Sequence, residues 1–237
     1  MASRPTITQA NRASRARLQP AADAVRVSSL RFASRFTREF FARDAVTVAR
    51  ELLGKLLIRR DGKSLLAGRI VEDEAYLGAV DPAAHAFNGR TPRNAVLFGP
   101  PGHAYVYFIY GNHYCTNVSC MPEGDAEGVL LRALEPVFGL EAMGEARALH
   151  LPSAPRVSQL RLIASGPGRM SEALGITRDR DNGKDLADPQ SDLWLADDGY
   201  RPERIAVTSR IGIKKAVSEP LRFLIAGNPF VSGPRAS

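Results

Sequence analysis

Cysteine is scarce in this sequence of 237 residues, which contains only Cys115 and Cys120. Two cysteines five positions apart are too few for a disulfide framework, and they lack the CxxC spacing of zinc sites. We therefore predict two buried thiols in a reducing compartment.

Long apolar runs are also missing, since none approaches the roughly 20 residues that cross a bilayer. No apolar segment precedes a small-residue cleavage site, so we expect a protein that is not secreted. With 44% hydrophobic residues, the chain can still bury a sizeable core in one domain, or in two at most.

The motifs of several enzyme classes do not occur. The four histidines show neither HxxxH nor HExxH spacing, which argues against a zinc site. The GxSxG turn of serine hydrolases and the GxxxxGK[ST] loop of P-loop enzymes are absent as well. These patterns predict neither a metal nor a cofactor.

Acidic residues are almost missing from positions 1–35, where Asp23 stands against seven arginines. Seven positive charges less one negative charge give +6, nearly the whole net charge of +7. Because this segment is also rich in alanine and serine, we predict a disordered basic tail. The alternatives are an organelle transit peptide, an electrostatic arm for DNA, and a start codon assigned too far upstream.

A folded region is predicted from residue 36 to residue 237. It opens with apolar residues at helical spacing, which end at Gly54. Two pairs of apolar segments, at 55–78 and 104–120, are joined by short polar turns and predict β-hairpins. Further strands are expected at 128–137, 192–199 and 204–213, a helix at 140–150, and a glycine loop leading into a helix within 165–176; residues 220–232 close the folded region. Strands that neighbour one another in hairpins indicate a single mixed α+β domain with a largely antiparallel sheet.

Three carboxylates follow one another in RIVEDEAYLG, at Glu72, Asp73 and Glu74. In an extended chain the side chains alternate between faces, so Glu72 and Glu74 share the face of Tyr76, and Asp73 points the other way. On this segment alone we favour a solvent-facing edge strand, where charged side chains are common. The alternative is a carboxylate kept for chemistry beside an aromatic ring.

Four of the six tyrosines gather in the second hairpin. Tyr110 directly precedes the Gly-Asn turn, where a large ring is well placed to insert into a base stack. Tyr107 lies deeper and can stack against a flat ligand. Core packing accounts for Tyr105 and Phe108, and we also predict that the single tryptophan, Trp194, lies in the core.

Together these segments resemble the alkyladenine (3-methyladenine, methylpurine) DNA glycosylase family. The resemblance is carried by RIVEDEAYLG, DPAAHAFNGRTPRN, YVYFIYGNHYCTNVS, GVLLRALEP, SGPGRMSEALGI and PLRFLIAGNPFVS. Each motif alone is weak, but the set occurs in the family's order and at its approximate spacing. It covers most of residues 37–232 and leaves out the basic tail.

The resemblance implies a monofunctional base-excision repair enzyme with flanking helices around a curved antiparallel sheet. Such an enzyme flips damaged purines (alkylated adenine or guanine, hypoxanthine, ethenoadenine) out of double-stranded DNA and hydrolyses the N-glycosidic bond. We expect it to need no membrane, metal or cofactor and to act as a monomer. Its expected location is the cytoplasm and nucleoid of a bacterium, or the nucleus of a eukaryote.

Five roles in base recognition and catalysis are implied by the resemblance. Glu74 is the general base that activates water. Tyr76 and Tyr107 stack on opposite faces of the flipped base. His85 contacts the base and the backbone near the lesion, and Asn117 reads the purine edge and rejects guanine by clashing with its exocyclic amine.

Two further roles concern the DNA itself. Tyr110 is the wedge that fills the gap left by flipping, and Arg132 holds the phosphate of the flipped nucleotide. No lysine lies in the matching stretches around the pocket, so we expect a water nucleophile, no Schiff base and no strand cleavage.

Two other functions are also compatible with parts of the pattern. A non-catalytic DNA-binding module would keep the tyrosines without needing Glu74. An enzyme of free nucleosides would need neither a wedge at Tyr110 nor a phosphate-holding Arg132.

Overall fold

The computed structural model describes residues 33–109, 111 and 113–233. The predicted tail up to residue 32 lies outside these ranges, and so does Tyr110. At the inner end of the segment assigned to the tail, strand β1 (Ser34–Arg35) pairs with β7 (Leu193–Asp197). Two residues ascribed to the tail thus belong to the sheet.

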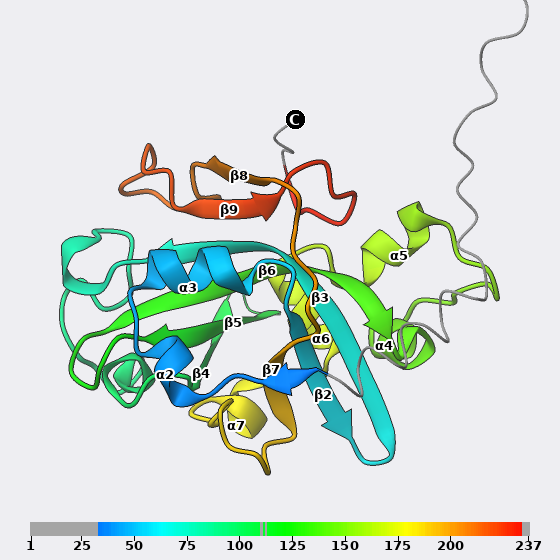
Figure 1. The fold of residues 1–237 in the computed structure, drawn as a ribbon, viewed down its shortest axis with the longest axis horizontal. Coiled ribbons are helices and arrows are strands. Elements are labelled where there is room, and N and C mark those ends of the chain that lie inside the picture. Colours follow the sequence, from blue (N-terminus) through cyan, green and yellow to red (C-terminus); the bar gives the residue numbers. More distant parts are fainter. Residues whose placement is uncertain (1–32, 110, 112, 234–237) are drawn as a thin grey trace, which may run out of the picture.

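The first predicted helix is two helices, α2 (Arg38–Phe41) and α3 (Ala45–Leu52). The break occurs before α3 because the side chain of Asp44 accepts a hydrogen bond from the Thr47 amide at 2.8 Å and caps the second helix. In Figure 1, α3 lies across the sheet.

The described residues build a nine-stranded sheet in which every pairing is antiparallel. Both predicted hairpins are present, and the strand that follows them in the sequence, β6, lies between them in the sheet. Their bounds are β2 (Leu56–Asp61), β3 (Ser64–Tyr76), β4 (Ala104–Ile109), β5 (His113–Cys120) and β6 (Glu127–Phe138). The main strand order is β1-β7-β2-β3-β6-β5-β4.

Strand β3 has strand neighbours on both edges at residues 67–69 and 72–74. Its first half pairs with β2 as far as Arg69, and beyond that point β9 (Arg222–Ile225) pairs with residues 72–74. Strand β6 pairs with the other edge of β3, and β8 (Ile205–Thr208) continues the sheet beyond β9. The edge-strand interpretation of RIVEDEAYLG is therefore wrong, since all three of its carboxylates have 0% exposure.

The pairing of β3 with β6 is irregular beside the carboxylates. Glu72 lies opposite Ala133 and Asp73 lies opposite Leu131, so Arg132 is left without a Cα partner on β3. An extra residue of this kind is a β-bulge, which redirects the side chain that it carries.

Four helices follow β6 in the described part of the chain: α4 (Leu140–Ala146), α5 (Val157–Ala164), α6 (Pro167–Ala173) and α7 (Arg178–Asp181). The sequence predicted α4 and α6 but not α5 or α7. Two 3-10 turns, η1 (Gly78–Val80) and η2 (Ala95–Phe98), interrupt the loop after β3. Figure 1 shows α4 and α5 at one end of the sheet and α7 beside β4.

A single α+β domain with an open, mostly antiparallel sheet is thus confirmed. Trp194 is buried, as predicted, and both cysteines are buried free thiols. Within the described ranges, no helix has both the length and the apolar surface to span a bilayer.

Candidate active site

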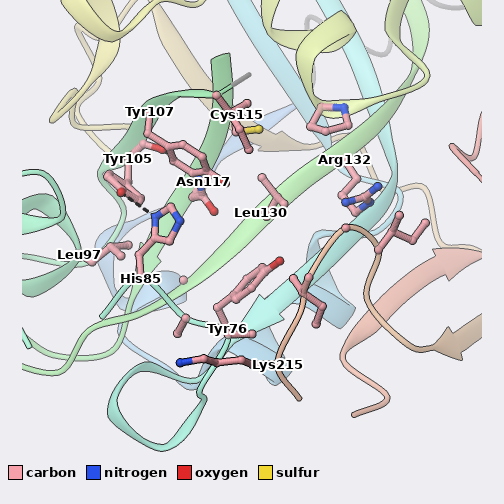
Figure 2. A pocket seen from close by; sticks show the side chains of 18 of the residues that line it. Tyr76, His85, Leu97, Tyr105, Tyr107, Cys115, Asn117, Leu130, Arg132 and Lys215 are labelled. Atoms are coloured by element: carbon pink, nitrogen blue, oxygen red, sulfur yellow. Dashed lines mark hydrogen bonds between the residues drawn. The ribbon is translucent and has the colours of Figure 1, made fainter. Parts of the chain in front are cut away.

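A cavity of about 550 Å³ opens between the second hairpin, the loop after β3 and the loop that joins β8 to β9. Five residues predicted from the sequence line it: Tyr76, His85, Tyr107, Asn117 and Arg132. Figure 2 shows Tyr76 and Tyr107 on opposite sides of the cavity, with His85 and Asn117 to one side and Arg132 to the other. Two facing aromatic rings form a slot suited to a flat ligand.

Glu74 lies directly behind this wall. Its Oε2 accepts a hydrogen bond from the Tyr76 hydroxyl at 2.9 Å, and its Oε1 accepts one from the Ile211 amide at 2.8 Å. Nη1 of Arg132 lies 3.2 Å from the same Oε1. Because Tyr76 and Arg132 both line the cavity, they separate it from a carboxylate that is itself fully buried.

Opposing effects act on the charge of Glu74. Burial raises its pKa, whereas Arg132, the Ile211 amide and the Tyr76 hydroxyl lower it. Burial, followed by the charge of Glu74, also raises the pKa of Tyr76. The Tyr76 hydroxyl therefore stays protonated and donates a hydrogen bond to the carboxylate. Glu74 is therefore a carboxylate with a raised pKa held by three donor groups, which is the state suited to a general base.

The Tyr76 ring is supported from behind by Arg210. The guanidinium carbon of Arg210 lies 4.6 Å from the ring centroid, within cation–π range. Arg210 also donates to both oxygens of Asp81, at 2.5 and 2.9 Å, and to the Ala75 carbonyl at 3.0 Å. This buried ion pair joins the loop after β3 to the β8–β9 loop, so the cavity is walled by two loops tied to each other.

His85 contacts Tyr105, whose hydroxyl lies 2.9 Å from its Nδ1. The side chain of Arg93 bonds to the same hydroxyl and, because arginine only donates, its partner there is the tyrosine oxygen. Burial and, after it, the charge of Arg93 lower the pKa of His85, which favours the neutral form of its ring.

Residues 39–229 match the model of a protein family described as Methylpurine-DNA glycosylase (MPG). The chain belongs to the methylpurine-DNA glycosylase family. The "Putative 3-methyladenine DNA glycosylase" of Koribacter versatilis is 61% identical over 208 residues, covering 88% of this chain and 98% of that protein. Proteins of the same name from Burkholderia lata and Methanoculleus marisnigri are 48% and 49% identical, covering 83% and 81% of this chain and 90% and 96% of their own.

This methylpurine-DNA glycosylase is a hydrolase that acts on N-glycosyl bonds in DNA repair. The family resemblance drawn from the sequence is confirmed. The two other functions considered there, a non-catalytic DNA-binding module and an enzyme of free nucleosides, do not fit this family.

The glycosylase brings six of the seven predicted site residues together, in or directly behind one cavity. The seventh, Tyr110, lies outside the described residues, and the individual roles of all seven stay predictions. Tyr105 is buried as predicted and also lines the cavity. The prediction of a core position for Phe108 is wrong, because its side chain is 46% exposed and its ring lies 5.1 Å from that of Tyr114.

Sequence reasoning missed one wall of the cavity, the β8–β9 loop with Ile211, Lys214 and Lys215. The prediction of a water nucleophile rested on the matching stretches, which contain no lysine around the pocket, whereas two lysines reach the cavity from outside those stretches. The predicted strand at 204–213 ends at Thr208, and no pattern in the residues after it indicates that the loop reaches the cavity. Throughout the described ranges, no group of three or more His, Cys, Asp and Glu side chains is placed to hold a metal ion.

Proposed function

We propose that this glycosylase accepts a flipped, damaged purine in the cavity and hydrolyses its N-glycosidic bond with water activated by Glu74. The observation that supports the proposal most directly is the position of Glu74. A buried carboxylate, held by Tyr76, Arg132 and the Ile211 amide, lies directly behind a slot between two aromatic rings.

Recognition of the base follows from the walls of the cavity. Alkylated purines are electron-poor or cationic, so the faces of Tyr76 and Tyr107 attract them. When Nδ1 of a neutral His85 ring accepts the Tyr105 hydroxyl proton, its Nε2–H is the donor that the ring presents to the base. Asn117 is fixed by a hydrogen bond from its Nδ2 to the Tyr105 carbonyl at 3.2 Å, and in this position it excludes the exocyclic amine of guanine by a clash.

The chemistry is hydrolysis at C1′ of the deoxyribose. The bond from C1′ to the purine nitrogen breaks through an oxocarbenium-like state, and the oxygen of water bonds to C1′. Glu74 takes the proton of that water, and its negative charge favours the developing cation. Each carboxylate oxygen can accept more than one hydrogen bond, but Glu74 is fully buried behind Tyr76 and Arg132. In this proposal, water reaches Glu74 when stacking of the base on Tyr76 shifts that side chain.

Contacts to the DNA backbone come from cations around the cavity. The contacts of Arg132 with Glu72 and Glu74 use its Nε and Nη1, so we assign its Nη2 to the phosphate of the flipped nucleotide. Lys214 and Lys215 are exposed where the β8–β9 loop lines the cavity, and a second phosphate contact is favourable there. The hairpin that carries Tyr110 is proposed to fill the space left in the duplex.

Glu74→Gln tests the proposal. The variant should excise hypoxanthine from a duplex oligonucleotide about 100-fold more slowly or worse under single-turnover conditions, while duplex binding persists. Glu203→Gln, a change at an exposed glutamate, is the matched control and should match the wild type. Undiminished excision by Glu74→Gln would show that another group activates the water.

A further inference from the structure

Glu72, two residues before the proposed base, is a fully buried carboxylate with three hydrogen-bond donors. Its Oε1 accepts from Nε of Arg132 and from Nε of Arg222, each at 2.8 Å. Its Oε2 accepts from the backbone amide of Ser232 at 2.5 Å. Removing a buried carboxylate from such a set leaves charged groups uncompensated, so Glu72 is more than a polar residue on a strand.

The backbone does not fix the side chain of Arg132 in the way a regular strand would. Arg132 is the extra residue of the bulge on β6, without a Cα partner on β3. A guanidinium group is a rigid plane, so holding its Nε also determines where its two Nη atoms lie. With Nε on Glu72, Nη1 lies 3.2 Å from Glu74.

We propose that Glu72 is a positioning residue of this glycosylase, which holds Arg132 and through it sets the orientation and charge balance of Glu74. This inference rests on the proposed role of Glu74 as the base. In the resulting chain of contacts, Glu72 joins Arg132 to Arg222 and Ser232, so the last part of the described chain supports the active site. Arg222 is itself held by hydrogen bonds to the Ser232 carbonyl at 2.8 Å and to the Thr208 hydroxyl at 3.1 Å.

The charge of Glu72 has a defined consequence for Glu74. Burial is the largest cause that raises the pKa of Glu74, Arg132 lowers it, and Glu72 raises it further. Sharing Arg132 between two carboxylates therefore keeps Glu74 a stronger base than it would be if it had Arg132 to itself. Loss of the Glu72 charge should lower the pKa of Glu74 and weaken it as a proton acceptor.

Asp73 provides a matched control between these two glutamates. It is equally buried, but it points to the opposite face of β3 and neither of its oxygens has a hydrogen-bond partner. Burial, followed by the charges of Glu72 and Glu74, raises the pKa of Asp73 well above the ordinary value, so Asp73→Asn replaces a group whose charged form is disfavoured there.

The test is the pH dependence of single-turnover hypoxanthine excision from a duplex, from about pH 5 to about pH 9. Glu72→Gln should lower the plateau rate by about ten-fold or more and move the acid limb toward lower pH by about half a unit or more. Asp73→Asn should keep the wild-type acid limb. A Glu72→Gln profile that superimposes on that of Asp73→Asn, with only thermal stability reduced, would overturn the inference and leave Glu72 a structural residue.

A second variant guards against loss of folding. Glu72→Gln with Arg222→Gln removes a carboxylate together with its outer cation and leaves Arg132 paired with Glu74, so fewer buried charges lack a partner. It should again show the lowered acid limb and the reduced rate, and a wild-type profile would contradict the proposal. Glu74→Gln in the same series distinguishes failure of the proposed base from failure of the proposed role of Glu72. Full activity of Glu74→Gln would show that Glu74 is not the base. Loss of activity in Glu74→Gln together with a wild-type profile of Glu72→Gln would contradict only the role of Glu72.

Discussion

At the scale of single residues, the Tyr76 hydroxyl and the Tyr76 ring act on different partners. The ring faces the cavity on one side and Arg210 on the other, while the hydroxyl donates to Glu74 at 2.9 Å. Removing the hydroxyl oxygen alone therefore separates stacking of the ring on the base from stabilisation of the Glu74 charge.

Tyr76→Phe should keep base binding and change the titration of the base. Loss of a hydrogen bond to the charged form of Glu74 raises its pKa, so the acid limb of single-turnover excision should move to higher pH by about one unit. Tyr107→Phe is the control, because the hydroxyl of that ring bonds to Cys115 instead. Identical acid limbs for the two variants would show that the Tyr76 hydroxyl does not set the charge of Glu74.

Asp73 makes the stability of the protein depend on pH. Its folded-state pKa is raised by burial, so above about pH 4 the unfolded chain loses this proton while the folded chain keeps it. The free energy of unfolding should therefore fall as pH rises through this range, by about 1.4 kcal/mol per pH unit from this group alone.

Asp73→Asn cannot titrate and should remove that part of the slope. Urea unfolding at several pH values between about 4.5 and 7 measures it, and the curves of variant and wild type should diverge as pH rises. Parallel curves would mean that Asp73 is already ionised in the folded protein. The same comparison with Glu203→Gln controls for changes at an exposed acid.

At the scale of elements, the sequence predicted strands better than it predicted what covers them. Apolar alternation correctly indicated β2, β3 and both hairpins. It could not show that β9 pairs with residues 72–74, because that pairing joins segments about 150 residues apart, and this pairing is what turns an apparent edge into the centre of the sheet.

The error at Phe108 has a related cause. Strand β6 pairs with β5 only from Asn117 onward, whereas β4 and β5 pair with each other from Ile109 and His113. The outer half of the hairpin thus extends beyond the sheet, and a good strand-forming residue there is left exposed. Helix α7 was missed because four residues are too few to show a helical period.

The contribution of the β8–β9 loop to DNA binding can be measured through its two lysines. Replacing both Lys214 and Lys215 by alanine should weaken duplex binding and reduce the slope of log K against log salt by about 1 to 2. Excision at saturating enzyme should persist, because water rather than lysine is the proposed nucleophile. Lys63→Ala, at the exposed turn between β2 and β3, is the control.

Borohydride treatment completes that experiment. A covalent complex with DNA that forms with the wild type and disappears in the double variant would establish a Schiff base at this loop. The proposed hydrolysis requires that no such complex forms with either protein.

At the scale of the whole molecule, the excess positive charge lies at one end of the sequence. Residues 1–32 contain six arginines and one acid, and the family match begins only at residue 39. Deleting residues 1–32 should leave single-turnover excision nearly unchanged and should flatten the salt dependence of DNA binding. A large loss of the chemical rate would show that this segment belongs to the catalytic domain.

The candidate site was predictable from sequence mainly through the order of its motifs. Alternation placed both Glu72 and Glu74 beside Tyr76 but could not choose between them, and the family resemblance made that choice. Neither approach indicated that Arg132 contacts both glutamates, because this depends on a bulge and on contacts with the end of the chain.

The hydrogen bond from the Ser232 amide to Glu72 spans 160 positions of sequence. During synthesis, β2 to β6 leave the ribosome before β9 and Ser232 have been made. At that stage the carboxylates of β3 would lie along an open strand edge. Contacts of such long range form late in folding. The proposed active site therefore requires the chain as far as Ser232, and a chain that stops before β9 should lack its support.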